Sequence, residues 1–223
     1  MMGRIHWRYL GENAIEISDI SSSIHIQLGL RDYLRGFPKL GIASFMLTNK
    51  TLTLVSETHS FMSISHIIDR VSAYQHKVDL NATIPSSIIP ICYDKAFALD
   101  HLKLERICKL DYEEIIALHL NAEYTVAMYG FMPGFPYLEG LPLALSIPRL
   151  KSPRKITPKG SVAIANEMCG IYPNQSPGGW HIIGRSPLTL FDSVKADVMP
   201  LKLGQKIKFQ RILKKDFDEY TAD

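Results

Sequence analysis

The second half of the chain consists of short apolar runs that glycine or proline interrupts. After residue 123, runs with strand character cover residues 124–131, 161–165, 181–184 and 188–191, and residues 205–212 alternate polar and apolar side chains. Many short strands separated by turns are typical of a β-barrel or a sandwich. This pattern predicts a β-barrel or sandwich for the second half of the chain.

The first 85 residues combine hairpin and helix patterns. Residues 5–10 and 14–18 flank one turn, and residues 42–47 and 51–56 flank another, which predicts two hairpins. Three serines at 21–23 precede a run that stops at Gly36, and residues 60–75 carry apolar side chains at helical spacing. We therefore expect a small α+β domain in which two helices cover one face of a sheet.

The segment between these halves predicts the domain organisation. Residues 77–90 contain Pro85 and Pro90 and have the composition of a linker or a crossing strand. Two short helices follow, and the second opens at Asp111 with Glu114 three residues later, which is a capping-box pattern. The prediction is an α+β protein with a small N-terminal α/β domain, residues 1–85, and a barrel domain, residues 86–223.

Composition excludes several classes of function. The net charge is +3 and no basic run is dense enough for a nucleic-acid-binding arm. The three cysteines lie far apart in the sequence and form neither a CxxC nor a zinc-ligand spacing, so we expect no metal site and a reducing, cytoplasmic environment. No apolar run is long enough for a membrane span, and no GxxxxGK[ST] motif offers a phosphate-binding loop for ATP.

Two loops rich in glycine, proline and aromatic residues flank a basic stretch. The loops are residues 130–138 and 176–185, and between Gly140 and Asn166 the chain has five cations and neither Asp nor Glu. Glycine lets the backbone approach a ligand closely, proline stiffens a loop, and a guanidinium binds a carboxylate or phosphate in a bidentate manner. We expect the three segments to form one anion-binding site. The alternative is a solvated basic loop between tight turns.

The residues themselves suggest roles within this site. Arg149 and Arg154, each preceded by proline, are candidates for binding the anion. Backbone N–H groups of Gly134, Gly178 and Gly179 are candidate donors, although tight turns also require glycine. The aromatic residues expected to line the pocket, or else to pack in the core, are Tyr137, Tyr172 and Trp180.

Two histidines are the candidate catalytic residues. His181 follows Trp180 in the glycine-rich loop and has the chemistry of a donor or a general base. His119 lies near the end of a predicted helix, where the alternative role is an interaction with the helix C-terminal dipole. A Ser/His/Asp order, a GxSxG motif and a carboxylate pair are all missing from the sequence.

Five motifs in the second half carry a family resemblance. They read GFMPGFPYLEGL at 130–141, PRLKSPR at 148–154, PKGSV at 158–162, GIYP at 170–173 and SPGGWHIIGRSPLTLF at 176–191. The chain resembles the family of bacterial 5-oxoprolinase B subunits, also known as the KipI or allophanate hydrolase subunit 1 family. The match is dense from about residue 115 to residue 209 and looser over the first 85 residues.

The resemblance implies a fold, partner subunits and a reaction. It implies an N-terminal α/β domain, a cyclophilin-like barrel, and a partner, the 5-oxoprolinase C subunit, which completes the active site. With the A subunit as well, the complex opens 5-oxoproline to L-glutamate using ATP, and whether ATP touches this chain is left open. The family's shared loops add Ser176 and Arg185 to the residues expected to bind a small carboxylate substrate, and His119 matches a histidine usual in the family.

The chain also departs from the family pattern. Residues 93–102 retain Tyr93, Phe97 and Asp100 but lack the family's glycines and glutamate, which predicts an altered substrate or lost chemistry. Besides a non-autonomous hydrolase subunit, the family names imply two other functions. One is a regulator that inhibits a sensor histidine kinase, and the other is the carboxyltransferase-like half of a urea carboxylase or allophanate system.

Overall fold

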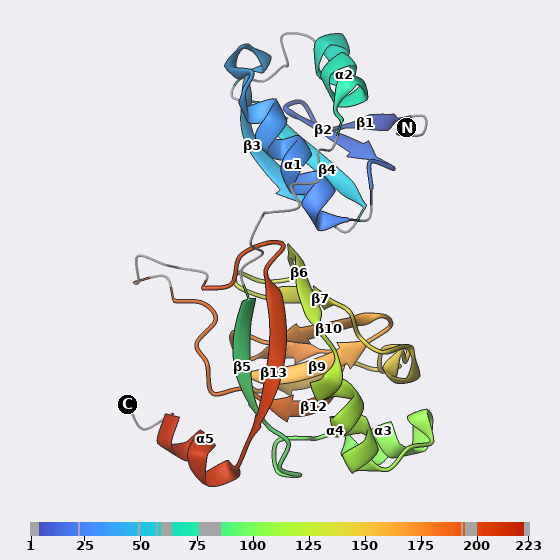
Figure 1. The fold of residues 1–223 in the computed structure, drawn as a ribbon, viewed down its shortest axis with the longest axis vertical. Helices are drawn as coiled ribbons and strands as arrows, with labels where there is room; N and C mark the ends of the chain where they lie inside the picture. Colours follow the sequence, from blue (N-terminus) through green and yellow to red (C-terminus); the bar gives the residue numbers. More distant parts are fainter. Residues whose placement is uncertain are drawn as a thin grey trace. The chain divides into compact units, whose positions relative to one another are not determined.

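The computed structural model describes residues 5–21, 23–48, 50–56, 58, 64–75, 86–192, 194 and 200–220. The chain divides into two compact units, Met1–Thr83 and Ile84–Asp223. The predicted boundary after residue 85 falls in a stretch outside the described residues, so it stays a prediction. The two-part α+β architecture itself is confirmed, with a four-stranded sheet and helices in one unit and a closed barrel in the other (Figure 1).

The first unit is an antiparallel sheet packed against two helices. Its strands are β1 (His6–Leu10), β2 (Ala14–Ser18), β3 (Ile42–Leu47) and β4 (Thr51–Ser56), in the order β1-β2-β4-β3. In the β2–β4 register Ile15 pairs with Leu54 and Ile17 with Leu52, so these four fully buried side chains share one face. The helices α1 (Ile24–Arg35) and α2 (Ile64–Ala73) add Leu30 and Ile67 to the same core. A 3-10 turn, η1 (Pro38–Leu40), follows α1.

The ends of α1 form differently from the prediction. Ser23 occupies the N-cap position, but its side chain makes no capping hydrogen bond, and the Ser23 amide instead donates to Oγ of Ser21 at 3.0 Å. Gly36 ends the helix with φ −66°, which is not the left-handed conformation that favours glycine. The predicted helix over 60–75 is confirmed as α2, while residues 60–63 lie outside the described residues.

The second unit is a seven-stranded closed barrel with the strand order β10-β7-β6-β13-β5-β12-β9 (Figure 1). Its strands are β5 (Ser86–Cys92), β6 (Tyr124–Tyr129), β7 (Pro136–Glu139), β9 (Ser161–Ala165), β10 (Met168–Ile171), β12 (His181–Arg185) and β13 (Lys206–Ile212). All the barrel pairings are antiparallel except that of β13 with β5. These two strands run parallel from the pair Lys206 and Ser86 to the pair Ile212 and Cys92. The barrel is closed by the pairing of its first and last strands in the sequence.

Short elements surround the barrel. They are α3 (His101–Cys108), α4 (Tyr112–Asn121), η2 (Leu143–Leu145), α5 (Lys214–Tyr220) and a two-stranded ribbon of β8 (Arg154–Thr157) and β11 (Ser176–Gly178). The predicted capping box is confirmed, because Oδ1 of Asp111 accepts from the Glu114 amide and Oε2 of Glu114 accepts from the Asp111 amide, both at 2.8 Å. The prediction of a strand at 188–191 is wrong. The crossing-strand interpretation of residues 77–90 holds for 86–90, which belong to β5.

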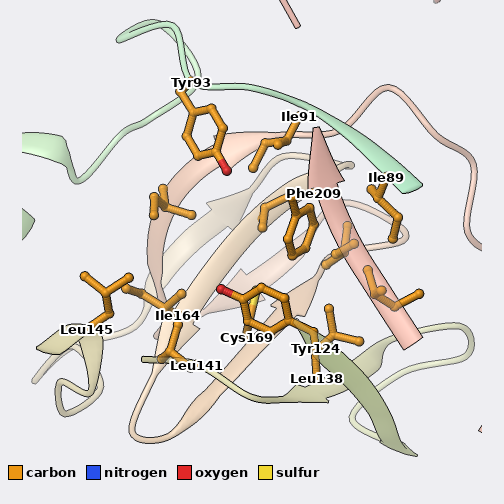
Figure 2. Packing of buried hydrophobic residues seen from close by; sticks show 14 of the residues in the cluster. Ile89, Ile91, Tyr93, Tyr124, Leu138, Leu141, Leu145, Ile164, Cys169 and Phe209 are labelled. Carbon is orange, nitrogen blue, oxygen red and sulfur yellow. The ribbon is translucent and has the colours of Figure 1, made fainter. Parts of the chain in front are cut away.

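Aliphatic and aromatic side chains fill the barrel interior. Figure 2 shows the rings of Tyr124 and Phe209, from the neighbouring strands β6 and β13, close together in the core, and their centroids lie 5.2 Å apart. Ile89, Ile164 and Leu138 come from three other strands and are fully or almost fully buried. The barrel is therefore a packed core, and ligand sites have to form on its outer surface.

Candidate functional site

The first glycine-rich loop is the connection between β6 and β7. Gly134 adopts φ +79°, and a Cβ there would collide with Phe191, so the turn requires glycine at this position. Phe131 also has a positive φ, +66°, although it is not glycine, and its side chain is 61% exposed. Its ring meets those of Phe135 and Tyr172 edge-on at 5.5 and 6.2 Å. A strained, exposed aromatic residue of this kind is characteristic of a binding site.

The basic segment and the second glycine-rich loop are held against each other. Their strands β8 and β11 pair, and the Leu150 amide donates to the Gly179 carbonyl at 2.8 Å. A Cβ at Gly178 would lie 2.5 Å from both Oγ1 of Thr157 and the Tyr172 hydroxyl, so only glycine permits this close packing. The backbone of the second loop thus lies directly beside Tyr172.

These three segments enclose a cavity of about 290 Å³. The residues that line it are Phe131, Phe135, Tyr137, Arg149, Leu150, Pro153, Tyr172, Pro177, Gly178, Gly179 and Trp180. The aromatic rings meet mainly edge-to-face, with Phe135 and Trp180 at 5.7 Å and Tyr137 and Trp180 at 5.6 Å. The volume is at the lower end of the range for small-molecule sites, which is about 300 Å³.

Arg149 is the charged residue of the cavity. Its guanidinium carbon lies 5.8 Å from the centroid of the Trp180 ring, and the exposed side chain has no acidic partner among the described residues. Burial raises the pKa of Tyr137, with Arg149 opposing that rise, and burial likewise raises the pKa of Tyr172. Both phenols therefore stay protonated at neutral pH and can donate hydrogen bonds to a ligand.

The structure brings five of the predicted substrate-binding residues together at this cavity: Tyr137, Arg149, Tyr172, Gly178 and Gly179. Gly134 lies in the loop that carries Phe131 and Phe135, without lining the cavity itself. Ser176 is next to the cavity on β11, where its hydroxyl donates to the Pro177 carbonyl at 3.1 Å. The expected meeting of the basic segment with both glycine-rich loops is thus observed.

Arg154 has a different environment from the one expected. Its Nη2 lies 2.7 and 2.6 Å from the two carboxylate oxygens of Asp100, and its Nη1 donates to the Trp180 carbonyl at 2.8 Å. The Asp100 side chain is only 1% exposed and also accepts from the Ile182 amide at 2.7 Å. The prediction that Arg154 binds an anionic ligand therefore has no geometric support here, because its guanidinium neutralises a buried carboxylate instead.

His181 lies on β12 beside this ion pair and is 3% exposed. Its Nε2 donates to the Pro148 carbonyl at 3.1 Å, which assigns the proton to Nε2, and Nδ1 is buried without a hydrogen-bond partner among the described residues. Burial lowers the pKa of His181, against the opposing effect of Asp100. His181 does not line the cavity, so a catalytic role there has no geometric support.

His119 lies in the barrel core, away from the cavity. The imidazole is fully buried, and its Nδ1 shares a 2.8 Å hydrogen bond with the Tyr93 hydroxyl. The ring also packs against Tyr124 at 5.2 Å and Phe209 at 4.6 Å, while Nε2 contacts Sγ of Cys169 at 3.5 Å. The expectation of a catalytic His119 therefore has no geometric support, because the side chain is buried in the barrel core.

The burial of His119 makes the stability of the protein dependent on pH. Burial lowers the pKa of His119 from 6.5 to about 3, so the unfolded chain takes up a proton in a range where the folded chain does not. As the pH falls from about 6.5 toward 3, this group should reduce the free energy of unfolding by up to about 1.4 kcal/mol per pH unit. Denaturant unfolding of wild type and His119→Gln across this range measures the slope.

The control for this experiment is His6→Gln, because His6 is exposed on β1. We expect the control to keep the wild-type slope between about pH 5 and 6.5, and His119→Gln to reduce it. Equal slopes for wild type and His119→Gln would show that His119 is not the titrating group.

The sequence reasoning missed two aspects of the site. Asp100 was noted only as a retained family residue, and its position at the start of α3 gave no signal that it pairs with Arg154. Leu150 and Pro153 line the cavity and were not among the residues predicted to bind the ligand. Arg185, predicted to bind substrate, lies instead in a separate cavity on the same unit.

None of the helices in the described part of the chain combines the length and apolar composition that a membrane crossing requires. Within the same residues, no three side chains of the His, Cys, Asp or Glu types gather into a possible metal site.

Comparison with known proteins assigns the chain to a class. A family model described as "Carboxyltransferase domain, subdomain C and D" matches residues 9–201, and the chain belongs to this family. At the level of individual proteins, it is 44% identical over 135 residues to the B subunit of 5-oxoprolinase from Bacillus subtilis (strain 168). That match covers 60% of this chain and 56% of the relative, so the chain spans about half the length of the curated relatives it matches.

Solved structures have the same fold. The crystal structure of TTHA0988 is 27% identical, with a TM-score of 0.74, over 94% of this chain and 40% of that chain. The urea amidolyase of K. lactis is 15% identical with a TM-score of 0.77, over 98% of this chain and 15% of that protein. At this identity the likeness to the urea amidolyase shows the fold alone.

Proposed function

We propose that the chain is the B subunit of a 5-oxoprolinase-type complex and that its aromatic cavity binds 5-oxoproline. The observation that carries this proposal is the Arg149 guanidinium at the edge of a small aromatic cavity, where it has no acidic partner among the residues that the structure describes. 5-Oxoproline is a five-membered lactam with one carboxylate. Arg149 suits the carboxylate, and the edges and faces of Trp180 and Phe135 suit the ring. The 44% identity to the Bacillus subtilis B subunit supports the same assignment.

The tyrosines extend this binding mode. Because burial raises the pKa of Tyr137 and Tyr172, each phenol remains a neutral donor near pH 7. A donor of this type suits the lactam carbonyl, which accepts hydrogen bonds and becomes more negative when it is attacked. The role we assign to this chain is therefore to bind the substrate, orient it and polarise its carbonyl.

The remaining chemistry is assigned to partner proteins. The ionisable groups of the cavity, among the lining residues that the structure describes, are one arginine and two tyrosines, and this set includes neither a carboxylate nor an imidazole base. The TTHA0988 structure supports a partner, since the matched part is 40% of a longer chain. We propose that the 5-oxoprolinase C subunit completes the site and that the A subunit joins them in the active complex.

ATP belongs to the complex in this proposal and not to this cavity. A nucleoside triphosphate needs several cations or backbone donors around its phosphates, whereas the cavity of about 290 Å³ offers one arginine. The residues that line this cavity therefore do not fit ATP. The sensor-kinase and urea-carboxylase alternatives stay predictions, because no contact in the described residues favours either of them.

Reconstitution tests the proposed function. We expect the purified chain alone to leave 5-oxoproline unchanged, and the chain with its cognate A and C partners to convert it to glutamate when ATP is present. The measurement is glutamate formation, and the controls omit each protein or ATP in turn. Full assembly of the three proteins without any consumption of 5-oxoproline would contradict the proposal.

A further inference from the structure

A second cavity, of about 450 Å³, lies on the barrel unit and shares no lining residue with the first. Its walls are Arg185 at the end of β12, the following segment 186–189, Lys159 from the turn before β9, and Phe217 and Tyr220 of α5. Two sequence motifs meet here that the proposed function does not use, PKGSV at 158–162 and the GRSPLTLF part of the last motif. The Ser186 amide joins them by donating to the Gly160 carbonyl at 2.8 Å.

Arg185 is held in a fixed position by a hydrogen bond and by two aromatic rings. Its Nε donates to the Lys159 carbonyl at 2.7 Å. The guanidinium carbon lies 5.5 Å from the centroid of the Phe97 ring and 5.7 Å from that of Phe217. Among the described residues no carboxylate lies within ion-pair distance of Arg185, so its two Nη groups are left to bind something else. Burial of this guanidinium lowers its pKa, as expected for a cation that lacks an anion nearby.

Lys159 adds a second positive charge to the same cavity. Its side chain is exposed, and Nζ lies 3.4 Å from Oγ1 of Thr189, a contact at the long end of the hydrogen-bond range. The nearby helix α5 carries acidic residues, among them Asp216, whose carboxylate accepts from the Leu213 amide at 3.2 Å. In the part of the chain that the structure describes, neither Lys159 nor Arg185 forms an ion pair with the acidic residues of this helix.

Hydroxyl groups complete the polar lining. Oγ of Ser186, a buried residue, accepts from the Leu188 amide at 3.3 Å, which leaves its own proton available to a ligand. Thr189 presents a second hydroxyl beside Lys159. Two cations and two hydroxyls around one cavity match the several acceptor oxygens and the double negative charge of a phosphate group better than a single carboxylate.

We propose that this second cavity binds a phosphate group, with Arg185 and Lys159 as its cationic ligands and Ser186 and Thr189 as hydroxyl donors. The site is independent of the aromatic cavity, and the inference does not require the function proposed above. Tyr220, on the α5 wall, gives the cavity an aromatic surface next to the cations, which suits a phosphorylated small molecule.

The test is a titration of the full chain with inorganic phosphate at constant ionic strength, followed by calorimetry and by amide chemical-shift changes. We expect saturable binding with shifts centred on residues 184–189. Arg185→Gln should weaken the binding by about tenfold or more, because it removes a charge-assisted pair. Lys159→Gln, which changes an exposed side chain, should weaken the binding about two- to fivefold.

The matched control is Lys155→Gln, an exposed lysine on β8 that lines neither cavity, and it should bind phosphate as wild type does. An absence of saturable phosphate binding would overturn the proposal. So would shifts centred on Arg149 and Trp180, or unchanged affinity in Lys159→Gln. Tighter binding of acetate than of phosphate would overturn the assignment to a phosphate group.

Discussion

Replacing Arg154 by methionine should destabilise the barrel unit by about 3 kcal/mol or more, because the buried Asp100 carboxylate then keeps only the exposed Lys103, whose Nζ lies 3.7 Å from Oδ1, as a cationic partner. Arg154 supplies a bidentate ion pair at 2.6 and 2.7 Å, and the Asp100 side chain is 1% exposed. Each kcal/mol lowers the thermal midpoint by about 2–4 °C for a protein of this size, so the midpoint should fall by about 6–12 °C. Thermal unfolding followed by circular dichroism measures this change.

Two further variants separate the ion pair from other effects of the Arg154→Met mutation. Lys155→Met changes an exposed cation on the same strand and should shift stability by less than about 0.5 kcal/mol. Arg154→Met combined with Asp100→Asn removes the unpaired charge while keeping an acceptor for the Ile182 amide, and it should recover part of the loss. Wild-type stability in Arg154→Met, together with lost 5-oxoproline binding, would restore Arg154 as a ligand-binding residue.

Replacing Arg149 by glutamine should have the opposite pattern, a large loss of binding with little loss of stability. If Arg149 pairs with the substrate carboxylate, its removal should weaken 5-oxoproline binding by about 10- to 100-fold, which corresponds to a charge-assisted hydrogen bond of about 1.5–3 kcal/mol. The side chain is exposed and has no acidic partner among the described residues, so the free energy of unfolding should change by less than about 0.5 kcal/mol. Calorimetric titration of the full chain measures the affinity.

Lys151→Gln is the matched control for Arg149→Gln, because Lys151 is an exposed cation two residues away that does not line the cavity. It should bind 5-oxoproline as wild type does. Equal affinity in wild type and Arg149→Gln would remove the main support for substrate binding at the aromatic cavity. The loss of activity in a reconstituted complex would then have to be explained by another surface.

The sequence predicted helices and hairpins with local signals better than it predicted the short strands that depend on pairing in the barrel. The hairpins of the first unit and the capping box of α4 follow from local patterns, because turn residues and cap residues act within a few positions of each other. Strands β7, β8, β10 and β11 were missed, since each has only three or four residues and β7 begins at a proline. Strands this short carry almost no periodic signal, and the barrel's pairings decide whether they form.

The same difference applies to the candidate site, where residue types within a segment were informative and contacts between distant residues were not predictable. The meeting of the two glycine-rich loops with the basic segment was predictable because all three contain residue types that serve ligands better than cores. The environments of the individual arginines were not predictable from the sequence. Arg149 lies over Trp180 without an acidic partner in the described part of the chain, whereas Arg154 pairs with an aspartate 54 residues away, although both residues are arginines. Only the three-dimensional fold distinguishes a binding cation from a structural one.

The parallel pairing of β5 with β13 has a consequence for biosynthesis. β5 opens the barrel unit and β13 is the last strand in the sequence, so during translation β5 keeps one edge unpaired until residues 206–212 have left the ribosome. In that interval the apolar side chains of Ile89 and Ile91, fully or almost fully buried in the finished barrel, lack one neighbouring strand. A nascent chain with this topology closes its barrel late and is prone to aggregation until β13 pairs with β5. A fragment that ends before Lys206 lacks β13 and should therefore stay prone to aggregation.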